Sequence, residues 1–131
     1  MLDQHTTQLR VRYDECDPMG FVHHSIYLRY FEIARIELFR LSGGNYGQLE
    51  QAGIFVVVVH VDCRYMAPAK YDDELAIQVK IDKMTQAKII HSYSISCGGK
   101  ELVAARVTLA VIDRQGRLQR IPDEIRHPGG L

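Results

Sequence analysis

The sequence carries no excess of charge of either sign: its 131 residues include 16 lysines and arginines against 16 aspartates and glutamates. Without a net charge, no overall electric field directs the chain to nucleic acid or to an anionic membrane surface. No apolar run approaches the roughly 20 residues that cross a bilayer, and residues 1–8 lack the apolar core of a signal peptide. We therefore expect a cytoplasmic protein with no nucleic-acid partner and no membrane-inserted segment.

Cysteine is scarce as well. The three cysteines, Cys16, Cys63 and Cys97, are odd in number and show no Cys-x-x-Cys spacing, which argues against a disulfide framework and a structural zinc site. Cys63 and Cys97 fall in strand-like runs, where we expect small buried apolar residues. Cys16 lies near histidines, which leaves a Cys–His nucleophile open. Four histidines have spacings that match no compact metal-ligand motif, and we expect no metal site among them: His23, His24, His60 and His91.

Repeats and low-complexity tracts are absent too, and one domain over residues 1–131 is expected. Apolar residues recur at helical spacing over residues 25–41, and Gly43 and Gly44 follow as a stop signal. These apolar residues cover more than half of the helix circumference, so we expect the helix to be buried. The remaining pattern predicts a short helix and five strands: a helix over 46–52 and strands over 8–14, 55–66, 75–82, 89–97 and 103–111.

This order of elements indicates an α+β fold in which an antiparallel sheet of about five strands curls around one long helix. The helix covers only one face of such a sheet. The other face and the edge strands need cover from elsewhere, so we expect a symmetric dimer as the minimum assembly.

Polar chemistry is concentrated in one short stretch, residues 16–24, just before the long helix. It places Asp17 on an Asp-Pro-x-Gly turn closed by Gly20, and puts two imidazoles, His23 and His24, next to the helix start. A carboxylate, a proton carrier and the free N–H groups of a helix N-terminus are what hydrolysis of an activated acyl group needs. The plainer alternative is that Asp17 only caps the turn or the helix.

The same stretch resembles a known family signature. Residues 17–22, Asp-Pro-Met-Gly-Phe-Val, with Tyr27 five residues later, are similar to the D-x-x-G-x-V-x-x-x-x-Y motif of hotdog-fold thioesterases. The likeness is greatest to the 4-hydroxybenzoyl-CoA thioesterase family and the bacterial short-chain acyl-CoA thioesterases grouped with it. It extends over residues 10–122 and includes further matches: Tyr30-Phe31-Glu32, Ala34-Arg35, Pro68-Ala69 and Tyr71-Asp72-Asp73. It implies the hotdog fold.

The resemblance also implies an enzyme that hydrolyses an acyl-CoA thioester to a carboxylic acid and coenzyme A, with no further cofactor. Asp17 would be the nucleophile or the general base, Gly20 would shape its turn, and the backbone N–H of His24 would polarise the thioester carbonyl. The His24 imidazole would orient water or protonate the departing thiolate. Relatives bind substrate across a subunit interface, which implies a homodimer or a dimer-of-dimers homotetramer.

Four residues are candidates for substrate binding: His23, Tyr27, Lys83 and Lys88. The two lysines are the basic residues that remain near the loop which, in the aromatic enzyme, binds the phosphates of coenzyme A. The chain departs from the family pattern in this loop and at Ile26, where many relatives have an asparagine. These departures weaken the phosphate-site prediction and remove one polar group near the turn.

Two other functions stay open at this level. A hotdog dehydratase acting on a hydroxyacyl thioester needs a histidine together with a carboxylate from the central helix, and this helix offers Glu32 and Glu37 but no histidine. A non-catalytic acyl-thioester-binding protein is the second alternative. The residues also leave open whether the acyl group is aliphatic or aromatic, and whether its thiol carrier is coenzyme A or a carrier protein.

Overall fold

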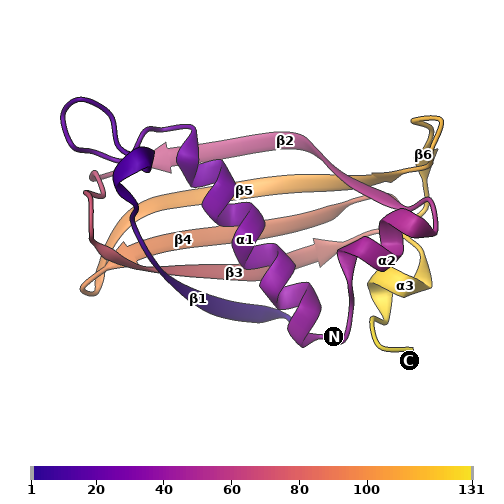
Figure 1. Cartoon of the computed structure of the whole chain (residues 1–131). Coiled ribbons are helices and arrows are strands. Elements are labelled where there is room, and N and C mark those ends of the chain that lie inside the picture. Colours follow the sequence, from indigo (N-terminus) through magenta and orange to yellow (C-terminus); the bar gives the residue numbers. More distant parts are fainter. Residues whose placement is uncertain (1, 131) are drawn as a thin grey trace.

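The computed structural model describes residues 2–130, and within them the chain folds into a six-stranded antiparallel sheet with one long helix across one face (Figure 1). The strands lie in the order β1-β3-β4-β5-β2, and the two-residue β6 pairs with the end of β5. The bounds are β1 Gln4–Arg10, the 3-10 helix η1 Tyr13–Glu15, α1 Ile26–Leu41, α2 Tyr46–Gln51, β2 Phe55–Tyr65, β3 Glu74–Met84, β4 Ile89–Cys97, β5 Lys100–Ile112, β6 Leu118–Gln119 and α3 Asp123–Arg126. The expected α+β hotdog architecture is confirmed.

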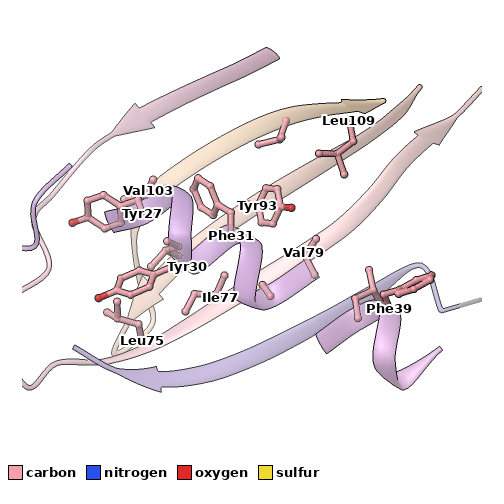
Figure 2. Close-up of a cluster of buried hydrophobic side chains, with 14 of the residues drawn as sticks. Tyr27, Tyr30, Phe31, Phe39, Leu75, Ile77, Val79, Tyr93, Val103 and Leu109 are labelled. Carbon is pink, nitrogen blue, oxygen red and sulfur yellow. The ribbon is translucent and has the colours of Figure 1, made fainter. Parts of the chain in front are cut away.

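The core lies between α1 and the sheet, because both present apolar side chains at matching periods. Figure 2 shows Phe31 of α1 facing Tyr93 of β4, and the two rings stack with centroids 4.5 Å apart. Burying an aromatic or aliphatic side chain of this size contributes about 1.5–3 kcal/mol. Six residues of α1 are buried in this way: Tyr27, Tyr30, Phe31, Ala34, Leu38 and Phe39.

The prediction that α1 is buried on most sides is wrong in part. Leu28, Ile33 and Leu41 are 43%, 39% and 55% exposed. The physical reason is that the sheet covers only one flank of the helix. Next to Leu28, the edge strand β2 exposes Val58 and Val59, so an apolar strip runs along this side of the protomer.

The first strand also differs from the prediction. It covers Gln4–Arg10 rather than residues 8–14, and Tyr13, which the predicted strand includes, is 80% exposed in the 3-10 helix η1. The chain turns away from the sheet here because Glu15 reaches back to Arg12, whose backbone N–H donates to Oε1 at 2.7 Å.

The outer face of the sheet is polar, so it does not require an apolar cover. Ser92 and Ser94 of β4 donate hydrogen bonds to Asp82 and Glu101 on the neighbouring strands. Arg106 of β5 also pairs with Asp82, at 3.5 Å. Within the described sheet, the backbone groups that have no neighbouring strand lie along the outer edges of β1 and β2.

Candidate active site

The loop between η1 and α1 is pinned at its base to the segment that precedes β3. Cys16 and Val22 form an antiparallel bridge across the loop, and Phe21 bridges to Lys70. The backbone N–H of Val22 donates to the carbonyl of Ala69 at 2.9 Å. These contacts hold the loop at one end of the sheet, beside the start of α1 (Figure 1).

Asp17 occupies a tight turn within this loop. Its carbonyl accepts from the N–H of Gly20 at 2.9 Å, and its own N–H donates to the carbonyl of Phe21 at 2.7 Å. Its Oδ1 accepts from the N–H groups of Met19 and Phe21 at 2.9 and 3.2 Å. Gly20 has a φ of +82°, a conformation that favours glycine. The turn thus uses one carboxylate oxygen, while Oδ2 has no hydrogen-bond partner within residues 2–130.

The chain repeats this turn at its opposite end. Asp113 accepts from the N–H of Gly116 at 3.0 Å, and its Oδ1 accepts from the N–H groups of Gln115 and Arg117, both at 2.9 Å. There Oδ2 is also occupied, by Arg117 and Gln119 at 3.3 and 3.2 Å. Hydrogen bonding from the backbone of Arg117 makes the largest contribution to the lowered pKa of Asp113. The free second oxygen is therefore what distinguishes Asp17.

The helix start supplies hydrogen-bond donors next to this carboxylate. The carbonyl of His23 accepts from the N–H of Ile26 at 2.9 Å, and Nδ1 of His23 lies 2.8 Å from Oγ of Ser25. The N–H of His24 has no acceptor among the described residues, and it precedes the positive end of the α1 dipole. Its carbonyl accepts from the hydroxyl of Tyr65 at 3.4 Å.

Asp17 and His24 line one open hollow of about 360 Å³, which we call the Asp17 hollow. Tyr27 also reaches its wall, but the side chain is buried and its hydroxyl accepts from the N–H of Ala69 at 3.2 Å. Gly20 and His23 do not line the hollow, so their contribution is to the turn and the helix start. Six of the residues that line the hollow are Asp17, Phe21, His24, Tyr27, Tyr65 and Met66.

Tyr65 and Met66 are site residues that the sequence patterns do not single out. Tyr65 is the last residue of β2 and Met66 follows it, and Tyr65 lies 41 positions beyond the histidine whose carbonyl it contacts. Burial, and then the hydrogen bond and charge of Cys63, raise the pKa of Tyr65 to about 12, so its hydroxyl stays protonated at neutral pH. The available signal was the Ala-Pro break directly after Met66, which marks a strand end.

The structure does not bring the two lysines to the Asp17 hollow. Lys83 lies near the end of β3 and Lys88 just before β4, whereas β3 begins beside the Asp17 loop. An 11-residue strand rises about 3.3 Å per residue, so the lysines lie at the far end of the protomer. They form no phosphate site with Asp17 of the same chain.

The remaining candidates take structural positions. Burial, followed by the charges of Asp17 and Glu15, raises the pKa of the Cys16 thiol, which disfavours a thiolate nucleophile. His91 is buried and its Nδ1 lies 3.2 Å from the hydroxyl of Tyr93. His60, by contrast, is exposed on β2.

Neither a metal-ligand cluster nor a membrane-crossing helix is found over residues 2–130. No group of three or more histidines, cysteines, aspartates or glutamates is placed to hold a metal ion. No helix among these residues is both long and apolar enough to span a membrane.

A sheet wrapped over one central helix, with an aspartate and an unpaired backbone N–H on residues that line one hollow at the helix start, is the arrangement expected of hotdog-fold thioester hydrolases. Comparison of the chain with known proteins agrees with this class. The chain belongs to the thioesterase-like superfamily, whose family model matches residues 11–128.

Individual relatives cover nearly the whole chain. It is 30% identical to the acyl-CoA thioesterase YbgC of Haemophilus influenzae over 121 residues, which is 90% of this chain and 88% of that protein. A crystal structure of a probable thioesterase from Bartonella henselae is 33% identical, with a TM-score of 0.86 over 91% of this chain and 99% of that one. A hypothetical protein from Aquifex aeolicus is 30% identical, with a TM-score of 0.89 over 93% and 96% of the two chains.

Proposed function

We propose that the protein is an acyl-CoA thioesterase that releases a carboxylic acid and coenzyme A, with Asp17 as the reacting carboxylate. One observation carries the proposal: the free Oδ2 of Asp17 belongs to a side chain that shares a hollow with His24, whose N–H is unpaired. The fixed Oδ1 holds the carboxylate in one orientation. A preorganised acid next to an oxyanion donor is the arrangement that acyl transfer needs.

Two routes fit this geometry. As a nucleophile, Oδ2 of Asp17 bonds to the thioester carbon, the oxyanion rests on the His24 N–H, and the thiolate leaves as a mixed anhydride forms. Water then hydrolyses the anhydride and restores the carboxylate. As a general base, Asp17 takes a proton from the water that attacks the same carbon. Both routes consume one water and give one acid and one thiol.

The role of His24 is proposed mainly for its backbone. Its side chain is exposed, with its ring centroid 4.3 Å from that of His23. Because the N–H remains when the side chain is changed, His24→Ala should retain far more activity than Asp17→Asn. A loss in His24→Ala as deep as that in Asp17→Asn would instead assign the imidazole a proton-transfer role.

We further propose that the protein works in the cytoplasm as a homodimer or a dimer of dimers, without a metal or redox cofactor. The free edge of β2 and the exposed Val58 and Val59 beside it support association at this side. Lys83 and Lys88 lie too far from Asp17 of their own chain. Any contact they make with the phosphates of coenzyme A would therefore serve the site of a second protomer.

The test is a hydrolysis screen over acyl-CoAs of graded length and aromaticity, read as thiol release. Wild type should turn over part of the panel, and Asp17→Asn should bind but lose at least about 10²–10⁴-fold in kcat. No turnover by wild type on any thioester would refute the enzyme, and would favour a binding protein. A dehydratase would take its catalytic carboxylate from the central helix. It is disfavoured because the side chains of Glu32 and Glu37 of α1 are 59% and 36% exposed to solvent.

A further inference from the structure

The loop that carries Asp17 is a short hairpin, residues 15–23, whose two arms are joined by backbone hydrogen bonds. The N–H of Asp17 donates to the carbonyl of Phe21 at 2.7 Å, and the N–H of His23 donates to the carbonyl of Glu15 at 2.9 Å. The first arm carries the reacting carboxylate, and the second arm runs into the start of α1. The spacing between the carboxylate and the unpaired N–H at the helix start therefore depends on how the two arms are held.

The second arm of this hairpin is fixed by the elements around it. It continues into α1, and the N–H of Val22 donates to the carbonyl of Ala69 in the segment before β3. The first arm has a different attachment. Within residues 2–130, a single hydrogen bond joins residues 12–17 to α1, and in it the hydroxyl of Tyr30 donates to Oε1 of Glu15 at 2.7 Å. This bond ties the carboxylate arm to the same rigid helix into which the other arm runs.

The Glu15–Tyr30 hydrogen bond is a strong one. Oε1 of Glu15 also accepts from the backbone N–H of Arg12 at 2.7 Å, so this half-buried carboxylate holds two short bonds at one oxygen. Hydrogen bonds to a carboxylate are charge-assisted and about twice as strong as neutral ones. Burial, and then the hydrogen bond to Glu15, raises the pKa of the Tyr30 hydroxyl above its ordinary value. The hydroxyl therefore keeps its proton and remains a donor at neutral pH.

Glu15 and Tyr30 do not line the Asp17 hollow. Both line a separate hollow of about 650 Å³, so their side chains do not touch a thioester held against Asp17. Tyr30 is nonetheless among the residues that match the family pattern, although the reaction itself makes no use of it. The two side chains can influence the reaction only through the hairpin to which Glu15 belongs.

We propose that Glu15 and Tyr30 are positioning residues of the active site, whose hydrogen bond sets the carboxylate of Asp17 against the N–H of His24. The proposal rests on the thioesterase function proposed above. Loss of the bond releases the first arm from α1, and a displacement of a reacting group by about 1 Å can lower the rate by about 10²-fold. The walls of the hollow that bind substrate stay in place, so kcat should fall by more than KM changes.

The hairpin is tested first without any turnover, by amide hydrogen exchange followed by NMR. In Tyr30→Phe and Glu15→Ala, the protection of the His23 amide, which donates to the carbonyl of Glu15, should fall roughly tenfold. Tyr93→Phe is the matched control, because it also removes a buried hydroxyl, one that lies 3.2 Å from Nδ1 of His91 in β4. This control should leave the protection of the His23 amide unchanged.

The same variants are then compared by steady-state kinetics on the acyl-CoA that wild type hydrolyses best, at a temperature where all are folded. Tyr30→Phe should lower kcat roughly tenfold, and Glu15→Ala, which also loses the Arg12 bond, up to about 10²-fold, with KM changed by less than about threefold. Glu15→Gln keeps an acceptor oxygen and should recover most of this loss. Because the two residues act through one bond, adding Tyr30→Phe to Glu15→Ala should lower kcat little further. Tyr93→Phe should keep the wild-type kcat.

Several results would overturn the proposal. One is a kcat in Tyr30→Phe equal to that in Tyr93→Phe, which would leave Tyr30 a stabilising residue only; others are unchanged protection of the His23 amide and additive losses in the double variant. A loss in Glu15→Gln as deep as in Glu15→Ala would also overturn it, since the amide retains the acceptor. Should Glu15→Ala not fold, Glu15→Asp replaces it, because its carboxylate is one methylene group short of Tyr30, and it should lower kcat. Loss of His23 protection in the variants, without turnover of any thioester by wild type, would instead refute the enzyme function and leave the role of Glu15 in the hairpin standing.

Discussion

The two equivalent aspartate turns allow the chemical role of the Asp17 turn to be separated from its structural role. Gly20 and Gly116 have φ angles of +82° and +79°, and a Cβ added at either would meet no atom within 4 Å. Replacing either glycine by alanine therefore introduces the same backbone strain and no steric clash. Only Gly20 lies next to the candidate nucleophile.

The expected loss of stability follows from the backbone alone. A left-handed conformation costs an alanine about 1–2 kcal/mol, while the stiffer unfolded chain returns about 0.4–1 kcal/mol. The net loss is about 1 kcal/mol for Gly20→Ala and for Gly116→Ala, which corresponds to a fall in Tm of about 3–5 °C for a chain of this size. Thermal unfolding followed by circular dichroism measures both.

Activity should distinguish the two variants. Relief of the strain at Gly20→Ala shifts the Asp17 carboxylate, and a displacement of about 1 Å can lower kcat/KM by about 10²-fold. Gly116→Ala should keep the wild-type kcat/KM at temperatures where both variants are folded. Equal activity in the two variants, at equal loss of Tm, would refute the argument that this turn positions the reacting carboxylate.

Three further outcomes are expected. Tyr30→Phe removes a buried hydroxyl that donates to Oε1 of Glu15 at 2.7 Å, so urea denaturation should show a loss of about 1.5–3 kcal/mol; unchanged stability would contradict this. The pKa of His91 lies near 4, well below its ordinary value, so below pH 6.5 the unfolded chain binds a proton that the folded chain does not. Stability should be full above that pH and fall by about 3 kcal/mol toward pH 4, and His91→Gln should flatten this slope in denaturation curves. Tyr65→Phe loses the hydroxyl that holds the carbonyl of His24, and steady-state kinetics should show kcat lowered by about threefold to tenfold with a smaller change in KM; a change in KM alone would make Tyr65 a binding residue only.

The strands in which apolar inner residues alternate regularly with outer polar ones could be predicted from the sequence. The predicted strand over residues 89–97 has the bounds of β4, because apolar and small polar residues alternate along it. The beginning of β1 could not be predicted. Its residues His5 and Thr7 pair with Val79 and Ile77 of β3, and so they lie on the inner face of the sheet. Polar residues at inner positions hide the period-two signal, and Oγ1 of Thr7 is buried without a hydrogen-bond partner among the described residues.

The candidate site was predictable where it is local in sequence. Residues 16–24 form one turn and one helix start, so their motif and their geometry coincide. Tyr65 enters the same hollow through the antiparallel course of β2, and no short motif records a contact over 41 positions. Lys83, in contrast, was wrongly predicted to belong to the site. Only the direction of β3 shows that this lysine lies at the opposite end of the protomer.

The repeated turn also bears on how this chain could be engineered and on how its sequence pattern is interpreted. An aspartate followed three positions later by a glycine occurs at both ends of the molecule with nearly the same backbone hydrogen bonds. The reactivity that we propose for Asp17 therefore cannot come from that pattern alone, and it requires both the free Oδ2 and the helix start beside it. Placing aliphatic side chains in the positions of Arg117 and Gln119 would free the second oxygen of Asp113. The result would be a turn with the same local form as the Asp17 turn but with no helix start beside it, and we expect it to be inert.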